Sequence, residues 1–269
     1  MTRRAATILA VGLLCALPLE AQSPELAGIA HVAFRVSDYQ KSRSFYQKLG
    51  FEEAFEFADP GKPEVSFIKL NDHQFIELYQ RSEDSQPGLM HICFESNDIE
   101  SLRTAYLKQG LQPTETKKFR AGNLLFVIHD PEGQLLEYTQ YLLGSLHSLD
   151  QGKHLGEHWI SEHLLQSSTP AQDVATERSF YTLKLGFEAS SNGSELRLPG
   201  QSGDRIELQS KAEGTKPRIV FTVKDLRHAA HDLRSRGLKL QKQNKDVSVT
   251  DPDGTLIVFN SQLRDGGNP

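Results

Sequence analysis

The chain has 269 residues and a formal net charge of −5, from 30 lysines and arginines against 35 aspartates and glutamates. This length suits two domains of ordinary size, each able to bury its own core. The mild acidity and the lack of a basic stripe argue against a nucleic-acid partner, because phosphate binding requires concentrated positive charge.

The N-terminus has the pattern of a signal peptide. Arg3 and Arg4 give a positive start, Ala5–Leu19 is an apolar run, and Ala21 offers a small residue for cleavage before Gln22. The run is short for a bilayer span. We therefore expect residues 1–21 to be removed, which would make the mature protein periplasmic or secreted, without a stable membrane anchor.

Cysteine usage agrees with a fold that needs no disulfide. Cys15 lies inside the apolar run behind the bulky Leu14, which disfavours a lipoprotein anchor. Removal of residues 1–21 leaves Cys93 alone, so no internal disulfide can form. Its place on a strand favours a small buried residue over a reactive thiol.

The first structural unit spans residues 28–80 and begins with an alternating strand. In His31–Val36, the residues Val32 and Phe34 face one way and His31 the other. Ser37 or Asp38 can cap the helix that follows, and Gly50 ends it. Three further strands are expected at Glu52–Phe57, Val65–Leu70 and Gln74–Tyr79.

The second unit, residues 88–141, repeats this plan. A strand at His91–Glu95 leads to a helix capped by Asp98 and ended by Gly110. Strands at Asn123–His129 and Gln134–Thr139 flank a turn.

The second half of the chain repeats the first. SRSFYQKLGFE (Ser42–Glu52) returns as ERSFYTLKLGFE (Glu177–Glu188), and HDPEGQLLEY (His129–Tyr138) returns as TDPDGTLIVF (Thr250–Phe259). A sheet this short would pair with its twin and curl into a half-barrel. The sequence thus predicts an α+β fold of four tandem βαβββ modules in two half-barrel domains, residues 28–142 and 160–262, joined by a linker at 143–159.

Several histidines lie in or near the linker. They could bind metal, but their spacing fits no helix face, so linker polarity is the favoured interpretation. They are His147, His154, His158 and His163.

Side chains alternate between the two faces of each strand, and this alternation places two histidines and two glutamates on the concave side of the predicted half-barrel, here called the cup. His31 and His91 begin the opening strands of the first two modules, and Glu77 and Glu137 lie in the closing strands. Such a set suits one divalent ion: Zn, Ni, Co, Mn or Fe(II). The alternative is a polar, metal-free lining.

Three other side chains share this predicted face. Phe75 and Tyr79 flank Glu77 at alternate positions and are expected to line the cup. Arg35 could hold an anionic group of a substrate, or could be a solvated charge at the rim.

These motifs resemble the vicinal oxygen chelate superfamily, which includes glyoxalase I, methylmalonyl-CoA epimerase, extradiol dioxygenases and bleomycin-resistance proteins. HVAFRVSDYQKSRSFYQKLGFE, FIELY and DPEGQLLEY are similar to its module. The resemblance to the isomerase-type members implies metal ligands at His31, Glu77, His91 and Glu137. The resemblance to the dioxygenases implies only His31, His91 and Glu137.

The second half departs from this pattern. Alignment of the repeats places Gln166, Arg218 and Val258 where His31, His91 and Glu137 stand, and only Glu207 remains as a carboxylate. Arg205 could pair with Glu207. His163 could replace Gln166 only if the register of the strand shifted by three residues. We expect a degenerate, metal-free domain.

The resemblance implies an enzyme that acts on a small molecule with adjacent oxygens. In the favoured interpretation it is a lyase or isomerase of glyoxalase or epimerase type, in which Glu77 or Glu137 moves a proton and the metal stabilises an enediolate. The alternatives are an Fe(II) extradiol dioxygenase and a binding protein of bleomycin-resistance type. Export argues against glutathione as co-substrate, and homodimer formation stays open.

Overall fold

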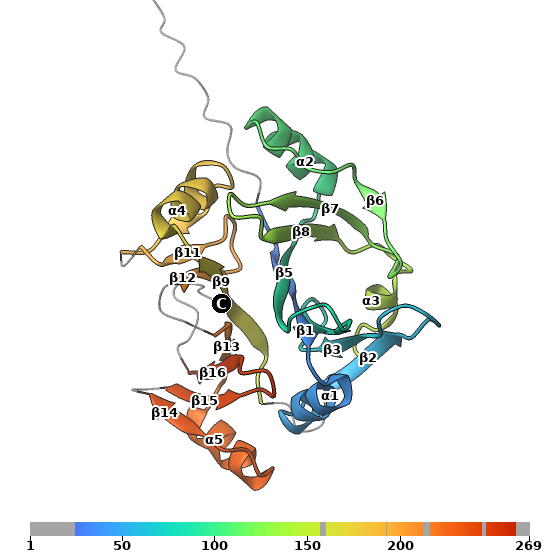
Figure 1. The fold of residues 1–269 in the computed structure, drawn as a ribbon, viewed down its shortest axis with the longest axis vertical. Helices are drawn as coiled ribbons and strands as arrows, with labels where there is room; N and C mark the ends of the chain where they lie inside the picture. Colours follow the sequence, from blue (N-terminus) through green and yellow to red (C-terminus); the bar gives the residue numbers. More distant parts are fainter. Residues whose placement is uncertain (1–24, 157–159, 192, 212–215, 244–245, 262–269) are drawn as a thin grey trace, which may run out of the picture.

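The computed structural model describes residues 25–156, 160–191, 193–211, 216–243 and 246–261. The predicted signal peptide lies outside these residues. The chain forms two curled eight-stranded sheets with helices on their outer sides (Figure 1). The predicted α+β fold of repeated modules is confirmed. None of the helices in the described ranges has the length and apolar character needed to cross a membrane.

The first sheet holds the first two modules, in the strand order β2-β3-β4-β1-β5-β8-β7-β6. The opening strands β1 and β5 pair antiparallel at the centre, and each closing strand, β4 or β8, runs parallel to its own opening strand. The elements are β1 (Gly28–Val36), α1 (Tyr39–Lys48), β2 (Glu52–Phe57), β3 (Val65–Lys69), β4 (Phe75–Gln80), β5 (Gly88–Glu95), α2 (Ile99–Lys108), β6 (Lys117–Lys118), β7 (Leu124–His129), β8 (Leu135–Gln140) and α3 (Leu146–Leu149).

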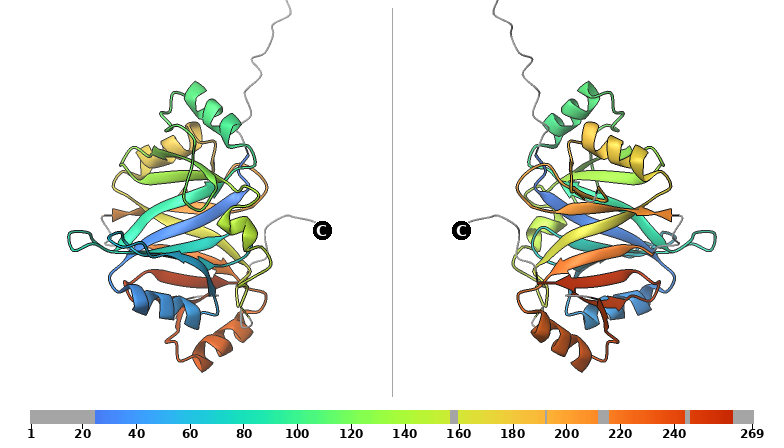
Figure 2. Two further views of the ribbon diagram at one scale, coloured as in Figure 1. Left: turned by 90° about the vertical axis from the view of Figure 1, so that its right-hand side faces the viewer. Right: turned by 90° about the vertical axis from the view of Figure 1, so that its left-hand side faces the viewer.

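The second sheet has the same order, β10-β11-β12-β9-β13-β16-β15-β14. The two sheets lie against each other with their long strands crossing the middle of the molecule (Figure 2). The elements are β9 (His163–Ala171), α4 (Val174–Leu183), β10 (Glu188–Ala189), β11 (Glu195–Arg197), β12 (Arg205–Ser210), β13 (Arg218–Thr222), α5 (Leu226–Ser235), β14 (Gln241–Gln243), β15 (Asp246–Thr250) and β16 (Leu256–Asn260).

An aspartate fixes the start of the module helix in all four repeats. Each side chain accepts a hydrogen bond from a backbone N–H in the first turn, which satisfies a donor that the helix itself cannot. The four caps are Asp38, Asp98, Asp173 and Asp225.

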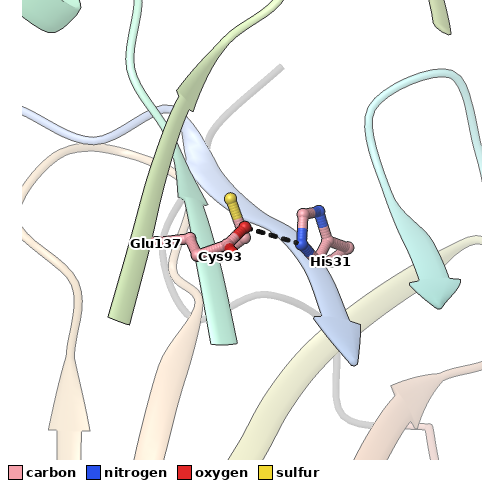
Figure 3. Close-up of side chains that lie close together, drawn as sticks. All are labelled: His31, Cys93 and Glu137. Carbon is pink, nitrogen blue, oxygen red and sulfur yellow. Dashed lines mark ion pairs between the residues drawn. The ribbon is translucent and has the colours of Figure 1, made fainter. Parts of the chain in front are cut away.

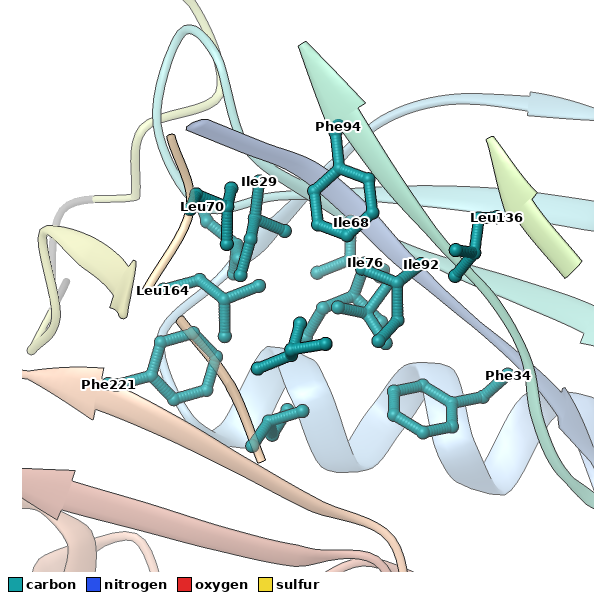
Figure 4. Close-up of a cluster of buried hydrophobic side chains, with 14 of the residues drawn as sticks. Ile29, Phe34, Ile68, Leu70, Ile76, Ile92, Phe94, Leu136, Leu164 and Phe221 are labelled. Carbon is teal, nitrogen blue, oxygen red and sulfur yellow. The ribbon is translucent and has the colours of Figure 1, made fainter. Parts of the chain in front are cut away.

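One hydrophobic core joins the two halves. The Phe51 and Phe221 rings lie 5.3 Å apart, and Phe94 lies 5.6 Å from Phe187. Leu164 of β9 packs among residues of the first sheet (Figure 4). The alternate positions of the first sheet are therefore left to face its concave side.

Two short elements were not expected from the sequence. The two-residue strand β6 extends the first sheet, and the helix α3 lies inside the predicted linker. Lys69 is fully buried and ties this segment down, because its Nζ donates to the Asp150 carboxylate at 2.9 Å and to the Asp150 carbonyl. The segment before residue 157 thus packs against the first half and is not a simple spacer.

The repeat also creates two equivalent contacts between the halves, with one difference. Tyr46 donates to Asp251 at 3.4 Å, and Tyr181 donates to Asp130 at 3.3 Å. One turn before the tyrosine, the first helix has Ser42 and the later helix has the buried Glu177. Burial and the neighbouring Asp130 raise the pKa of Glu177 to about 7.

This carboxyl pair predicts a pH-dependent stability. Glu177 holds its proton at higher pH in the folded protein than its ordinary pKa of 4.5 allows when unfolded, so folding stability falls as pH rises from about 4.5 to 7. Glu177→Gln should raise the free energy of unfolding at pH 8 by on the order of 1–3 kcal/mol, with little gain at pH 4.5. Urea unfolding at both pH values, with the α2 variant Glu100→Gln as control, measures this. An equal gain at both pH values would contradict it.

Candidate metal centre

Four strands bring the predicted ligand residues together on the concave face of the first sheet. His31 lies on β1, Glu77 on β4, His91 on β5 and Glu137 on β8. The pairing register explains the convergence, because Ala33 of β1 is opposite both Glu77 and His91. The intervening residues, such as Val32, belong to the core on the other face.

The donor atoms lie within a few ångströms of one another. The Nε2 atoms of His31 and His91 are 3.0 Å apart. Glu137 Oε2 lies 3.5 Å from each of these nitrogens, and Glu77 Oε1 lies 3.4 Å from His31 Nδ1. His91 Nε2 and Glu77 Oε2 are 3.9 Å apart.

Burial disfavours the charged forms of these groups. It lowers the pKa of His31 to about 3 and that of His91 to about 4. Burial and the nearby Glu137 raise the pKa of Glu77 to about 8, and burial also raises the pKa of Glu137. The short histidine–glutamate contacts are therefore contacts between uncharged imidazoles and carboxyl groups that resist ionisation, not strong ion pairs.

The donor set fits a divalent cation. Metal bonds of about 2.0–2.2 Å at angles of about 90–110° separate neighbouring donors by about 2.8–3.6 Å. The spacings among His31 Nε2, His91 Nε2 and Glu137 Oε2 fall in this range, whereas Glu77 lies beside the other nitrogen of His31 and 3.9 Å from His91 Nε2. In addition, His31 Nδ1 is buried and has no hydrogen-bond partner. Two imidazoles and two carboxylates suit the borderline ions Zn, Ni, Co, Mn and Fe(II).

Cys93 is a member of this cluster that the sequence interpretation treated as a plain core residue. It is opposite His31 on one side and Glu137 on the other, and its sulfur approaches both side chains (Figure 3). Burial and the two glutamates raise the pKa of its thiol. Its position two residues after His91, on the same strand face, was the signal that could have identified it.

A cavity of about 370 Å³ opens over the cluster. His31, Glu77 and Glu137 line it on the side of the cluster, and further polar side chains, among them Lys62, Arg120 and His147, line it elsewhere. Its walls are mainly apolar and aromatic, from Phe57, Val65, Phe67, Phe119 and Leu125. Such a lining suits a small organic molecule whose polar end meets the cluster.

The three predicted substrate-binding residues are placed differently. Tyr79 lines the cavity, and its hydroxyl donates to Glu77 Oε2 at 2.8 Å. Phe75 has the predicted orientation but is fully buried beside Val65 and Phe67, so it does not reach the cavity surface. Arg35 lies in a separate pocket with Pro87 and Lys216.

Of the two alternatives for Arg35, the contact with a substrate is corrected by the distance of Arg35 along the strand. It is four residues from His31, or about 13 Å at about 3.3 Å per residue. That distance takes it to the end of β1, where its guanidinium donates to the Gln86 carbonyl at 3.4 Å. Phe75 is corrected for another reason, since the ring of His147 covers it at a centroid distance of 4.7 Å.

His147 is the second residue of the candidate site that the sequence interpretation missed. It was assigned to linker polarity, yet it is buried at 5% exposure and lines the cavity. Its Nδ1 is bonded to the Asn123 side chain at 2.8 Å. The four-residue helix that places it is too short to leave a periodic signal in the sequence.

In the second half, the guanidinium of Arg218 lies at the position that corresponds to the candidate metal centre. The strand register aligns Gln166, Glu207 and Arg218 with His31, Glu77 and His91. The Arg218 guanidinium lies 3.1 Å from the Glu207 carboxylate, and Gln166 Nε2 donates to the same carboxylate at 3.1 Å. Val258 supplies no donor where Glu137 stands.

The other second-half candidates have different partners. Arg205 contacts Glu195 at 3.5 Å, so the expected Arg205–Glu207 pair is replaced by Arg218–Glu207. His163 is bonded to the buried Asp204. Among the described residues, the groups of potential ligands all lie in the first half.

Comparison with known proteins agrees with this fold. Residues 28–138 match the model of the Glyoxalase/Bleomycin resistance protein/Dioxygenase superfamily. No curated protein sequence matches the chain. The resemblance inferred from the sequence motifs is confirmed, for the first half by this family model and for the fold by solved structures.

Three solved structures illustrate the shared fold. The Mn(II)-bound glyoxalase from Novosphingobium aromaticivorans has 16% identity and a TM-score of 0.68, covering 89% of this chain and 83% of that chain. A catechol 2,3-dioxygenase has 16% identity and a TM-score of 0.66, covering 91% of each chain. The 2,3-dioxygenase LapB from Pseudomonas sp. KL28 has 14% identity and a TM-score of 0.69, covering 92% and 95%.

The contacts predict one metal ion per chain, bound in the first half. His31→Ala and His91→Ala each remove a nitrogen donor, so each should weaken metal binding by more than the roughly 10–100-fold typical of losing an outer-shell partner. Gln166→Ala, at the position equivalent to His31, should leave the stoichiometry unchanged. Elemental analysis of dialysed protein measures the metal content per chain of the wild type and of each variant. Two ions in the wild-type protein, one of them lost on changing Glu207, would contradict this prediction.

Proposed function

We propose that this protein is a metal-dependent enzyme of lyase or isomerase type, which acts on a small molecule with adjacent oxygens. The observation that carries the proposal is the convergence of His31, Glu77, His91 and Glu137 beneath an apolar-walled cavity. The fold shared with a Mn(II)-bound glyoxalase supports it. The four side chains would hold one divalent ion.

A bound ion would supply Lewis-acid polarisation of the substrate oxygens and favour an enediolate. The proton transfer falls to a carboxylate of this chain. Glu77 is the better candidate, because the hydroxyl of Tyr79 holds its Oε2 and fixes the orientation of the carboxyl group. Its burial places the group where water does not compete for the proton. Glu137 completes the ligand set from the opposite closing strand.

The first alternative is an Fe(II) extradiol-type dioxygenase acting on a catechol-like compound. The aromatic lining of the cavity and the fold shared with two 2,3-dioxygenases support this interpretation. His31, His91 and Glu137 would then be the ligands, and Glu77 would orient one of them. A binding protein of bleomycin-resistance type is the non-enzymatic alternative.

Export is part of the proposal and is supported by the sequence of residues 1–21. Glutathione is largely a cytosolic thiol, so an exported enzyme would act on a different substrate. Homodimer formation stays a prediction.

Glu77 separates the enzymatic interpretations. In an isomerase, Glu77→Gln keeps an oxygen donor but removes the basic carboxylate, so turnover should fall by roughly 10²–10⁴. In a dioxygenase the same change should cost about 1 kcal/mol, the size of a lost hydrogen bond. Metal content should change little in either case.

The measurement requires a substrate screen with α-hydroxyketones, hemithioacetals of thiols other than glutathione, and catechols. Tyr79→Phe is the matched control, because it keeps the Glu77 carboxylate and removes only its hydrogen-bond donor. Near wild-type turnover in Glu77→Gln would refute the isomerase assignment. No turnover by the wild-type protein in any class, together with tight binding, would favour sequestration.

Processing at the N-terminus is tested separately. We expect the mature chain to begin near Gln22 and to be found outside the cytoplasm, because Arg3, Arg4 and Ala5–Leu19 form a signal pattern. Intact-mass analysis of protein from its own cell fractions measures this. Membrane-bound protein that retains Met1 would overturn the expectation.

A further inference from the structure

His147 places an unpaired hydrogen-bond donor beside the candidate metal centre. Its ring lines the cavity together with His31, Glu77 and Glu137, and only 5% of the residue is exposed. Its Nε2 has no hydrogen-bond partner among the described residues. A buried polar group without a partner is destabilising and therefore requires an explanation.

The hydrogen-bond network fixes which ring nitrogen carries the proton. Asn123 Oδ1 accepts from the Leu142 backbone N–H at 3.1 Å, so its Nδ2 is the end that donates to His147 Nδ1 at 2.8 Å. Since Nδ1 accepts, the neutral imidazole carries its proton on Nε2. Burial lowers the pKa of His147 to about 3, so the ring stays neutral.

The ring is held rigidly in place. Tyr141 stacks on it at a centroid distance of 4.8 Å, and Phe75 contacts it nearly at a right angle at 4.7 Å. The helix that carries it is fixed by Lys69 through Asp150 and by the Leu146 N–H, which donates to the Ala121 carbonyl at 2.8 Å. A donor held this firmly is prepared to bind an acceptor at small entropic cost.

We propose that His147 donates a hydrogen bond from Nε2 to an oxygen of the molecule bound in the cavity, and so selects for ligands that carry a negatively charged oxygen. This inference rests on the proposed metal-dependent function, because the ion would hold that molecule. Two cationic side chains, Lys62 and Arg120, also line the cavity, but both pair with Asp59. A neutral N–H suits a position near a divalent ion, because a cation there would be repelled. His147 is thus a residue of substrate specificity and not a metal ligand.

The test uses the full chain loaded with Zn(II) and benzohydroxamate as the probe, an aromatic anion with two adjacent oxygens. His147→Phe keeps a ring of similar size among Phe55, Phe67 and Phe75 but removes the donor. Calorimetry should show about 10- to 100-fold weaker probe binding, as for a lost hydrogen bond to a charged oxygen. His147→Gln, which retains an N–H, should recover most of the affinity, and the exposed control His129→Phe should bind as wild type.

A spectroscopic measurement on the wild-type protein gives a second readout. Nitrogen-15 NMR of the histidine rings should show the Nε2–H form for His147, assigned by the loss of its signal in His147→Gln. Addition of the probe should move that N–H proton downfield. Equal probe affinity in wild type and His147→Phe, or an unmoved proton signal, would overturn the inference.

The zinc content of each variant separates this inference from the proposed function. Failure of the wild-type protein to take up zinc would refute both. Normal zinc uptake with unchanged probe binding in His147→Phe would refute only the role of His147, whose N–H would then face the aromatic rings around it.

Discussion

Burial of carboxylates on the concave face of a sheet is the constraint on which this molecule depends. An unpaired buried carboxylate costs several kcal/mol, so each half must provide a countercharge or keep the group protonated. The first half places Glu77 and Glu137 beside neutral imidazoles and therefore leaves the positive charge to come from outside the chain. The second half supplies it internally with Arg218, which pairs with Glu207.

This difference lets one scaffold serve two purposes. The Arg218–Glu207 pair fills the second cup, while Leu164 and Phe221 of the same half contribute to the core shared with the first sheet. The second half thus stabilises the face opposite the candidate metal centre. A rigid backing matters there, because ligand side chains must stay within a few tenths of an ångström of their positions to select an ion.

The sequence predicted the fold and most of the cluster, because the period of a strand is two and the repeat is clear. Parity alone oriented His31, Glu77 and His91 correctly. The residues whose positions were predicted wrongly share the correct strand face. Their access to the cavity is decided by their distance along the strand or by another segment that covers them. Arg35 shares the parity of His31 but lies about 13 Å away, and Phe75 has the right face but is covered by His147.

The segment after the first sheet explains why the cavity has its present shape. A plain linker would leave Phe75 and Phe67 open to solvent, and the cup would be a shallow groove. Instead α3 covers them, because the buried ammonium group of Lys69 requires acceptors, and Asp150 supplies its carboxylate and carbonyl beside the carboxylate of Asp72. This requirement positions α3, and α3 in turn positions His147. The ring of His147 then forms one wall of the cavity. The connection between the two halves is therefore itself part of the candidate site.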